Sequence, residues 1–250
     1  MPSAPNTIST AFWTYIIPMI ATRAMRIGLV LFALFASGVV LLYMAGIFAS
    51  EWGIDALWGM QHFLVMAGVP VGAILLSEIP IRDGITHRTL LYPLLGPVPR
   101  MTLVVVRMAV TSAVLAIGAG LLMLLVRLLL KDDPGFIWRE LLSVTLGAFA
   151  FVAFFGLFHL YGRRGLITGL VVLFLFDIPL GKLPFTLRNV SLSYHMGVIA
   201  DQQDSMQLPI SLGTPPTSIL ASAVVLLVVA IVFGALVAVG FKRKDLGELC

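Results

Sequence analysis

The chain has 250 residues, of which 60% are hydrophobic and only 11% are charged. Soluble domains carry about 25% charged residues, so this composition and a mean hydropathy of +1.05 exclude an ordinary soluble enzyme and predict an all-α, polytopic membrane protein. The net charge of +4 is not a nucleic-acid signal, because the basic residues lie at the ends of apolar runs, where they set membrane orientation.

The first 26 residues predict a short tail followed by a helix that lies in the membrane interface. Residues 1–10 are small and polar, and residues 11–26 place apolar side chains at helical spacing before two arginines: Phe12, Trp13, Ile16, Ile17, Ile20, Arg23 and Arg26. Aromatic residues at headgroup depth and flanking cations are typical of interfacial helices. The alternative is that 11–26 extends the first membrane span, although Pro18 favours a break.

Six apolar runs follow, each interrupted by a polar turn, and they form a single transmembrane domain over 1–250. We expect spans at about 27–48, 57–76, 101–130, 141–160, 166–183 and 218–241. An apolar stretch of about 20 residues crosses the hydrocarbon core as a helix. Between the spans, residues 77–100 and 184–216 are the two long polar interruptions.

The distribution of Lys and Arg predicts which side of the membrane each loop occupies. Eleven of the 16 lie at the termini and around the two loops on the same side: Arg23, Arg26, Arg82, Arg88, Arg100, Arg107, Arg163, Arg164, Lys242, Arg243 and Lys244. Because cytoplasmic loops carry the excess of Lys and Arg, we expect both termini and residues 77–100 to lie on the cytoplasmic side. The membrane is expected to be a bacterial inner (plasma) membrane. Residues 184–216 are then an external loop.

Several kinds of chemistry are excluded by missing motifs. The chain has no G-x-x-x-x-G-K-[ST], no H-E-x-x-H and no G-x-S-x-G, which are the signatures of phosphate cradles, zinc peptidases and serine hydrolases. A single cysteine, Cys250, excludes an internal disulfide, and the four histidines are scattered: His62, His87, His159 and His195. We therefore expect no catalytic, cofactor or metal site on this chain.

The segment 77–100 is the polar feature around which the spans are arranged. Charged and apolar residues alternate so that a short amphipathic helix fits from about Gly84 to Tyr92, and Pro93 ends or kinks it. The following Gly96-Pro97-Val98-Pro99 predicts a stiff turn back to the membrane. A solvated loop without a specific role is the alternative interpretation of this pattern.

A motif runs through this segment at Glu78, Arg82, Asp83, Gly84, Thr86, Pro97, Arg100 and Arg107, with the neighbouring His87 and Arg88. It resembles the cytoplasmic signature of type-2 ABC transporter permeases, of the type V-like exporter class. The basic tail Phe241–Leu246 is also similar to the family's. Ile85 separates Gly84 from Thr86 and Pro99 replaces a serine, which are departures from the family pattern.

The resemblance implies a transmembrane permease subunit of an ATP-driven exporter without its own ATPase. Its partners would be a dimer of ABC ATPase subunits, which hold the ATP and Mg, and a second permease copy or paralogue. The positions given above would couple the permease to the ATPase, with a short helix of 77–100 seated in a groove of that subunit. The chain would then be a transport subunit and not an enzyme.

Two other classes of function stay open on the sequence. An intramembrane enzyme or assembly factor would need a convergent polar cluster, for which His62, His159 and Asp177 are the candidates. A proton-coupled carrier would need carboxylates along the spans. The residues that would line a path are apolar or small, which suits a lipid, an amphipathic drug or a peptide as well as plain helix packing: Phe32, Phe35, Met66, Gly68 and Phe174.

Overall fold

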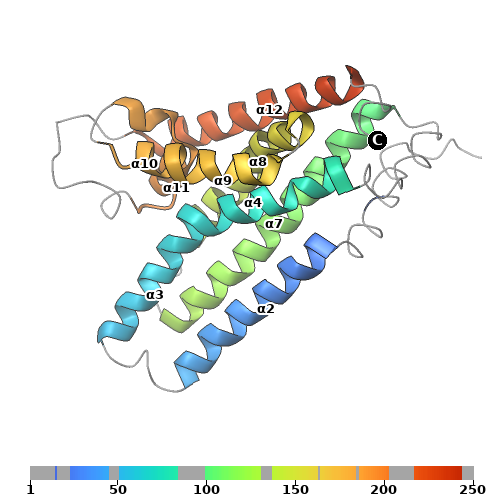
Figure 1. Cartoon of the computed structure of the whole chain (residues 1–250). Coiled ribbons are helices and arrows are strands. Elements are labelled where there is room, and N and C mark those ends of the chain that lie inside the picture. Colours follow the sequence, from blue (N-terminus) through green and yellow to red (C-terminus); the bar gives the residue numbers. More distant parts are fainter. Residues whose placement is uncertain are drawn as a thin grey trace, which may run out of the picture.

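The computed structural model describes residues 15, 23–44, 51–83, 99–130, 137–162, 164–183, 186–202 and 217–243. Every regular element in these ranges is a helix (Figure 1). The elements are α2 (Arg23–Met44), α3 (Glu51–Phe63), η2 (Leu64–Gly68), α4 (Val69–Leu76), η3 (Ile79–Asp83), α7 (Arg100–Leu130), α8 (Ile137–Tyr161), α9 (Gly165–Val172), η5 (Leu173–Asp177), α10 (Ile178–Gly181), η6 (Thr186–Val190), α11 (Leu192–Ile199) and α12 (Ile219–Arg243).

Four of the described helices are long and apolar enough to cross a membrane, so the chain is a membrane protein. They are Ile54–Ile81, Arg100–Leu129, Ile137–Tyr161 and Ile219–Arg243, and they coincide with the second, third, fourth and sixth expected spans. Two shorter apolar helices, Gly28–Leu41 and Gly165–Gly181, lie where the first and fifth spans are expected. Large apolar side chains are exposed along α12, for example Leu220 and Ile231, which suits a lipid-facing surface.

The helix that contains the second span continues beyond the end expected at Leu76. The chain is helical through most of 77–83 and ends in η3, where Ile79 and Ile81 are buried. From the sequence, Ser77 is expected to begin a segment that faces water. In the structure its hydroxyl donates to the carbonyl of Ile74 at 3.1 Å. A hydroxyl that bonds its own helix needs no water, so Ser77 does not end the helix.

Two helices contain a π-helical turn that ends two residues before a proline. In η2 the amide of Val69 bonds to the carbonyl of Leu64, and Pro70 follows; in η5 the amide of Ile178 bonds to Leu173, and Pro179 follows. Proline has no amide to donate, and a π turn is one way in which a helix accommodates the interruption. The first π turn contacts α11, and Asp177 at the end of the second accepts the amide of Leu192 in α11.

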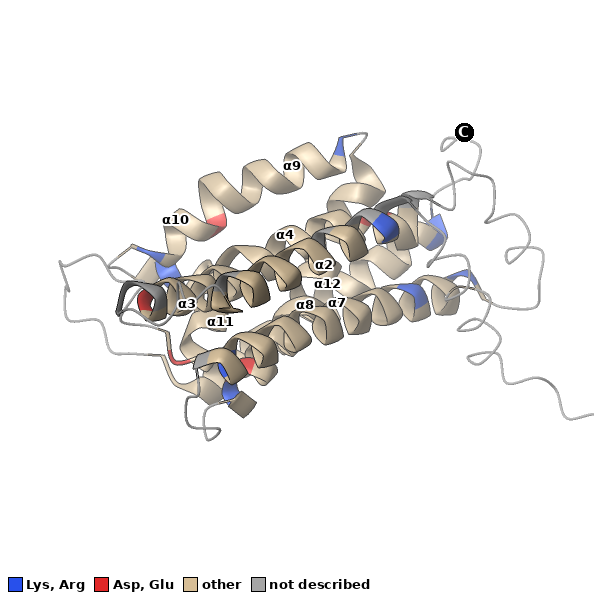
Figure 2. Ribbon diagram, turned by 90° about the horizontal axis from the view of Figure 1, so that it is seen from below, with Lys and Arg blue, Asp and Glu red and all other residues tan. Residues whose placement is uncertain are grey.

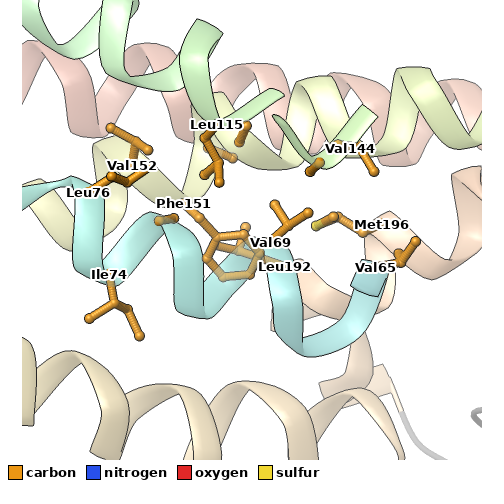
Figure 3. Close-up of a cluster of buried hydrophobic side chains, with 14 of the residues drawn as sticks. Val65, Val69, Ile74, Leu76, Leu115, Val144, Phe151, Val152, Leu192 and Met196 are labelled. Atoms are coloured by element: carbon orange, nitrogen blue, oxygen red, sulfur yellow. The ribbon is translucent and has the colours of Figure 1, made fainter. Parts of the chain in front are cut away.

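The buried core is centred on α8, which contacts α4, α7, α9, α11 and α12. Phe151 and Phe155 of α8 are almost fully buried, and their rings stack with centroids 5.6 Å apart. Figure 3 shows Phe151 among Val69, Leu192 and other aliphatic side chains of α4, α7 and α11. At Gly147 an added Cβ would lie 2.3 Å from the sulfur of Met196, so α11 approaches the α8 backbone directly.

The described part of 184–216 is not an open external loop. Residues 186–190 form η6, and every residue of α11 is buried. Ser191 caps the N-terminus of α11 by accepting the amide of Tyr194 at 3.1 Å, as short polar residues do. The segment therefore folds back into the bundle between α8 and α12, next to η2 (Figure 1).

Candidate functional site

The structure describes five of the ten predicted coupling residues. Glu78 is half-buried, Arg82 and Asp83 belong to η3, Arg100 is exposed at the start of α7, and Arg107 is buried within α7. Gly84, Thr86, His87, Arg88 and Pro97, and with them the expected amphipathic helix, lie outside the described residues. The described part of the site is therefore its base, where the segment leaves and rejoins the bundle.

Ile81 fixes that base to three other helices. It is 1% exposed and belongs to a cluster with side chains of α7, α8 and α12: Leu103, Val104, Met108, Ala153, Leu160, Val237 and Phe241. Gly156 of α8 permits this approach, because a Cβ there would lie 3.3 Å from the terminal carbons of both Ile81 and Met108. Interiors packed at this density transmit displacement, so movement of η3 would be passed to all three helices.

His159 ties the same end of α8 to α4. Its Nε2 lies 3.0 Å from the carbonyl of Ile74, which makes this nitrogen the donor. The ring also packs against the first residue of α9, since a Cβ at Gly165 would lie 2.6 Å from Nδ1. His159 thus has a structural role at the junction of α4, α8 and α9.

Arg107 is a buried cation that lies over an aromatic ring. The guanidinium carbon is 5.0 Å from the ring centroid of Tyr15, and the side chain is 5% exposed. Thr111 donates to the carbonyl of Arg107 at 2.9 Å, so its oxygen is left to accept from the Tyr15 hydroxyl, also at 2.9 Å. Tyr15 is thereby held against the face near the N-terminus of α7 that Arg107 occupies.

A second charged cluster lies at the opposite ends of α7 and α8. Arg127 donates from Nε to Glu140 Oε2 at 3.0 Å and from Nη2 to Oε1 at 2.6 Å, which is the bidentate geometry that favours Arg over Lys. Gln61 of α3 also donates to Glu140, and Trp58 lies 4.9 Å from the Arg127 guanidinium. The cluster joins the C-terminal end of α7 and the N-terminal end of α8 to α3.

Both ends of α11 are held by charged side chains. At its N-terminus the Asp177 carboxylate accepts the amides of Leu192 and Ser193 at 2.7 and 3.2 Å, and the Ser193 hydroxyl. A carboxylate at this position is favoured by the helix dipole. At the other end, Arg139 donates to the carbonyl of Ile199 at 3.2 Å and pairs with Asp201 at 2.9 Å.

His195 joins α11 to α12 and to η6. Its Nε2 lies 2.9 Å from the carbonyl of Asn189, and its Nδ1 lies 3.0 Å from the hydroxyl of Ser222. Because a carbonyl only accepts, Nε2 carries the proton and Nδ1 accepts from Ser222. Burial lowers the pKa of His195, although the Asn189 carbonyl and the Asp177 charge oppose this shift.

These polar groups do not converge on one reaction centre. His62 bonds to Gln202 at 3.2 Å, whereas His159 bonds to α4 and Asp177 caps α11. The Ser222–His195 pair has a nucleophile–base arrangement, but Ser222 and His195 are 0% and 1% exposed, so they hold helices together. Within the described ranges, no group of three or more His, Cys, Asp or Glu residues is arranged to hold a metal ion.

The Arg127–Glu140 pair and the anchoring of α11 were not predicted from the sequence. A detectable signal was present, because two opposite charges 13 positions apart flank one short turn between apolar runs. No family model matches the chain, and no curated protein sequence matches it.

Proposed function

We propose that this chain is the transmembrane permease subunit of an ATP-driven ABC exporter, driven through residues 77–100 by a separate ATPase. Three features support the proposal: the apolar helices, the charged segment between the second and third expected spans, and the resemblance in its motif. The packing of Ile81 is the observation that supports the proposal most. A force applied just after Asp83 would act on a helix end that packs against α7, α8 and α12.

In this proposal, closure of the ATPase dimer moves 77–100 and the bundle follows. Displacement of η3 would pass through Leu103 and Val104 to α7, and through Gly156 to α8. Because α8 contacts most of the other helices, it would spread the movement to α4, α9 and α11. A second permease copy or paralogue would complete the transport path, and ATP and Mg would bind to the partner ATPase.

The topology that goes with this function has six spans and both termini in the cytoplasm. The two shorter helices would be the first and fifth spans; at 1.5 Å per residue, the 22 residues of α2 extend about 33 Å. The exposed cations Arg26, Arg100, Arg164, Lys242 and Arg243 would lie at the cytoplasmic surface, and α11 near the external one. Figure 2 shows the charged residues mainly toward the helix ends.

The test is coupled transport with a reconstituted ATPase partner. Reversal of charge by Arg82→Glu or Arg88→Glu should abolish transport while ATP hydrolysis by the partner continues, and the chain should still insert. Lys182→Glu, an exposed cation in the α10–η6 region, is the matched control and should transport normally. Normal coupling in both Arg variants, or transport that persists without any ATPase, would refute the proposal.

The two alternatives gain no specific support from the described residues. Asp177 is engaged as a helix cap by three donors, which is a structural use of the carboxylate. A proton-coupled carrier would stop when a protonophore collapses the gradient and continue when ATP is depleted. An ATP-driven permease should show the reverse, so the same vesicles separate the two classes.

A further inference from the structure

Arg107 is a buried positive charge for which the described part of the chain supplies no carboxylate. It lies seven positions into α7 from Arg100, so at 1.5 Å per residue it is about 10 Å deeper. Its side chain is 95% buried, and its Nε atom is enclosed without a hydrogen-bond partner among the described residues. The Tyr15 ring and the Arg107 guanidinium are in cation–π contact, which satisfies no N–H donor.

The stretches of sequence around Tyr15 and after η3 carry no acid, since residues 1–22 and 84–98 contain no Asp or Glu. Asp245 and Glu248 follow α12 in the sequence. Glu78 is half-buried, and Asp83 is the nearest other acidic residue before α7 in the sequence. Charged groups inside a membrane protein are usually paired or face a functional path, so a buried guanidinium without an acid among the described residues points to an external anion.

We infer that Arg107 binds the anionic head of an amphiphile, a phosphate or carboxylate on an apolar chain, at the face near the N-terminus of α7. Guanidinium recognises such oxyanions through two parallel N–H donors. An apolar chain suits this depth, because α7 is long and apolar enough to cross a membrane. Arg100 lies on nearly the same helical face two turns nearer the surface, where it would attract the headgroup first.

Two sources share this chemistry: an anionic membrane phospholipid and an amphiphilic transport substrate. The site needs neither nucleotide nor a second protein, so it is independent of the proposed coupling to an ATPase. If coupling failed its test, the anion site would still stand.

The experiment measures thermal unfolding of the full chain in neutral dodecyl maltoside micelles, with and without dodecyl phosphate. Ligand that binds the folded state raises its stability, so dodecyl phosphate should raise the unfolding midpoint of the wild type. Arg107→Met should bind dodecyl phosphate at least about tenfold more weakly, the value expected for losing a hydrogen bond to a charged group. Met fills a volume similar to that of Arg, so Arg107→Met removes the charge and keeps the packing. If this variant does not fold, Arg107→Lys replaces it, because Lys keeps the charge but not the two parallel N–H donors.

Control variants decide the result. Arg100→Met, on the same face but exposed, should keep most of the midpoint rise. An equal rise in wild type and Arg107→Met overturns the inference. If Asp83, Asp245 or Glu248 neutralises Arg107 internally, the wild type will not respond, whereas Asp83→Asn, Asp245→Asn or Glu248→Gln will, and that outcome overturns it too.

A second arm identifies the source of the anion. Vesicles of phosphatidylcholine are compared with vesicles that also contain phosphatidylglycerol. An Arg107-dependent rise in stability with phosphatidylglycerol assigns the site to membrane lipid. A response to single-chain dodecyl phosphate alone assigns it to an amphiphilic substrate, and both results require the guanidinium.

Discussion

Removal of one partner from the Arg127–Glu140 pair should strongly destabilise the fold. The two side chains are 7% and 1% exposed, so Glu140→Ala leaves the guanidinium buried without its carboxylate. It removes two hydrogen bonds from Arg127 and one from Gln61. Breaking a buried ion pair in this way costs about 3–5 kcal/mol.

The matched double variant separates the pair from the packing around it. Arg127→Met combined with Glu140→Leu removes both charges and keeps the volume, and such replacements are often neutral or stabilising by about 1–4 kcal/mol. We therefore expect the double variant to be more stable than either single variant. Asp201→Asn removes the charge of the partly exposed pair with Arg139, and Asn tolerates the φ of 61° at this position. It should cost only about 0–1 kcal/mol, because Asp201 is 54% exposed.

The assay is the free energy of unfolding from SDS titration in mixed micelles, followed by circular dichroism. The four proteins of the cycle give the coupling energy of the pair directly. If Glu140→Ala cost no more than Asp201→Asn, burial of the pair would contribute nothing, and the reasoning from its geometry would be wrong.

Two further predictions concern α11. Gly147→Val should lower the free energy of unfolding by about 1–3 kcal/mol through overpacking, because its Cβ would fall 2.3 Å from the Met196 sulfur. The control Gly118→Ala, whose Cβ would have no neighbour within 4 Å, should leave the SDS midpoint unchanged or higher. Equal effects of the two substitutions would contradict the close packing of α11 on α8. The folded pKa of His195 is lowered from its ordinary value of 6.5 by burial, so the unfolded chain takes up the proton first and stability is lost as the pH falls below about 6.5. Unfolding midpoints at pH 7.5 and 5.5 measure this loss, which His195→Gln should reduce; an unchanged pH dependence would count against it.

Hydropathy predicted the long spans well because their identity depends on composition. The third, fourth and sixth expected spans coincide with α7, α8 and α12 within a few residues. Apolar length is a property of the segment itself, and a helix satisfies its own backbone groups in lipid. The all-helical class and the membrane character were therefore accessible from the sequence.

Polar residues were harder to interpret because their partners are not visible in the sequence. Ser77 suggested water, yet it bonds to Ile74 within its own helix, and the helix continued to Asp83. The segment containing Tyr194 and His195 resembled a loop, although its polar atoms bond to Thr217 and Ser222 of a distant part of the chain. Such partners come from tertiary contacts, which composition does not report.

The short α11 also has a consequence for the order in which the protein is made. Its eight residues span about 12 Å, too little to cross a bilayer, and they carry Ser193, Tyr194 and His195. The last of these is satisfied by Ser222, which the ribosome adds later. We expect α11 to stay outside the bundle until α12 has been inserted, so a nascent chain arrested before residue 217 should remain open to protease at α11, whereas the finished protein should resist cleavage there.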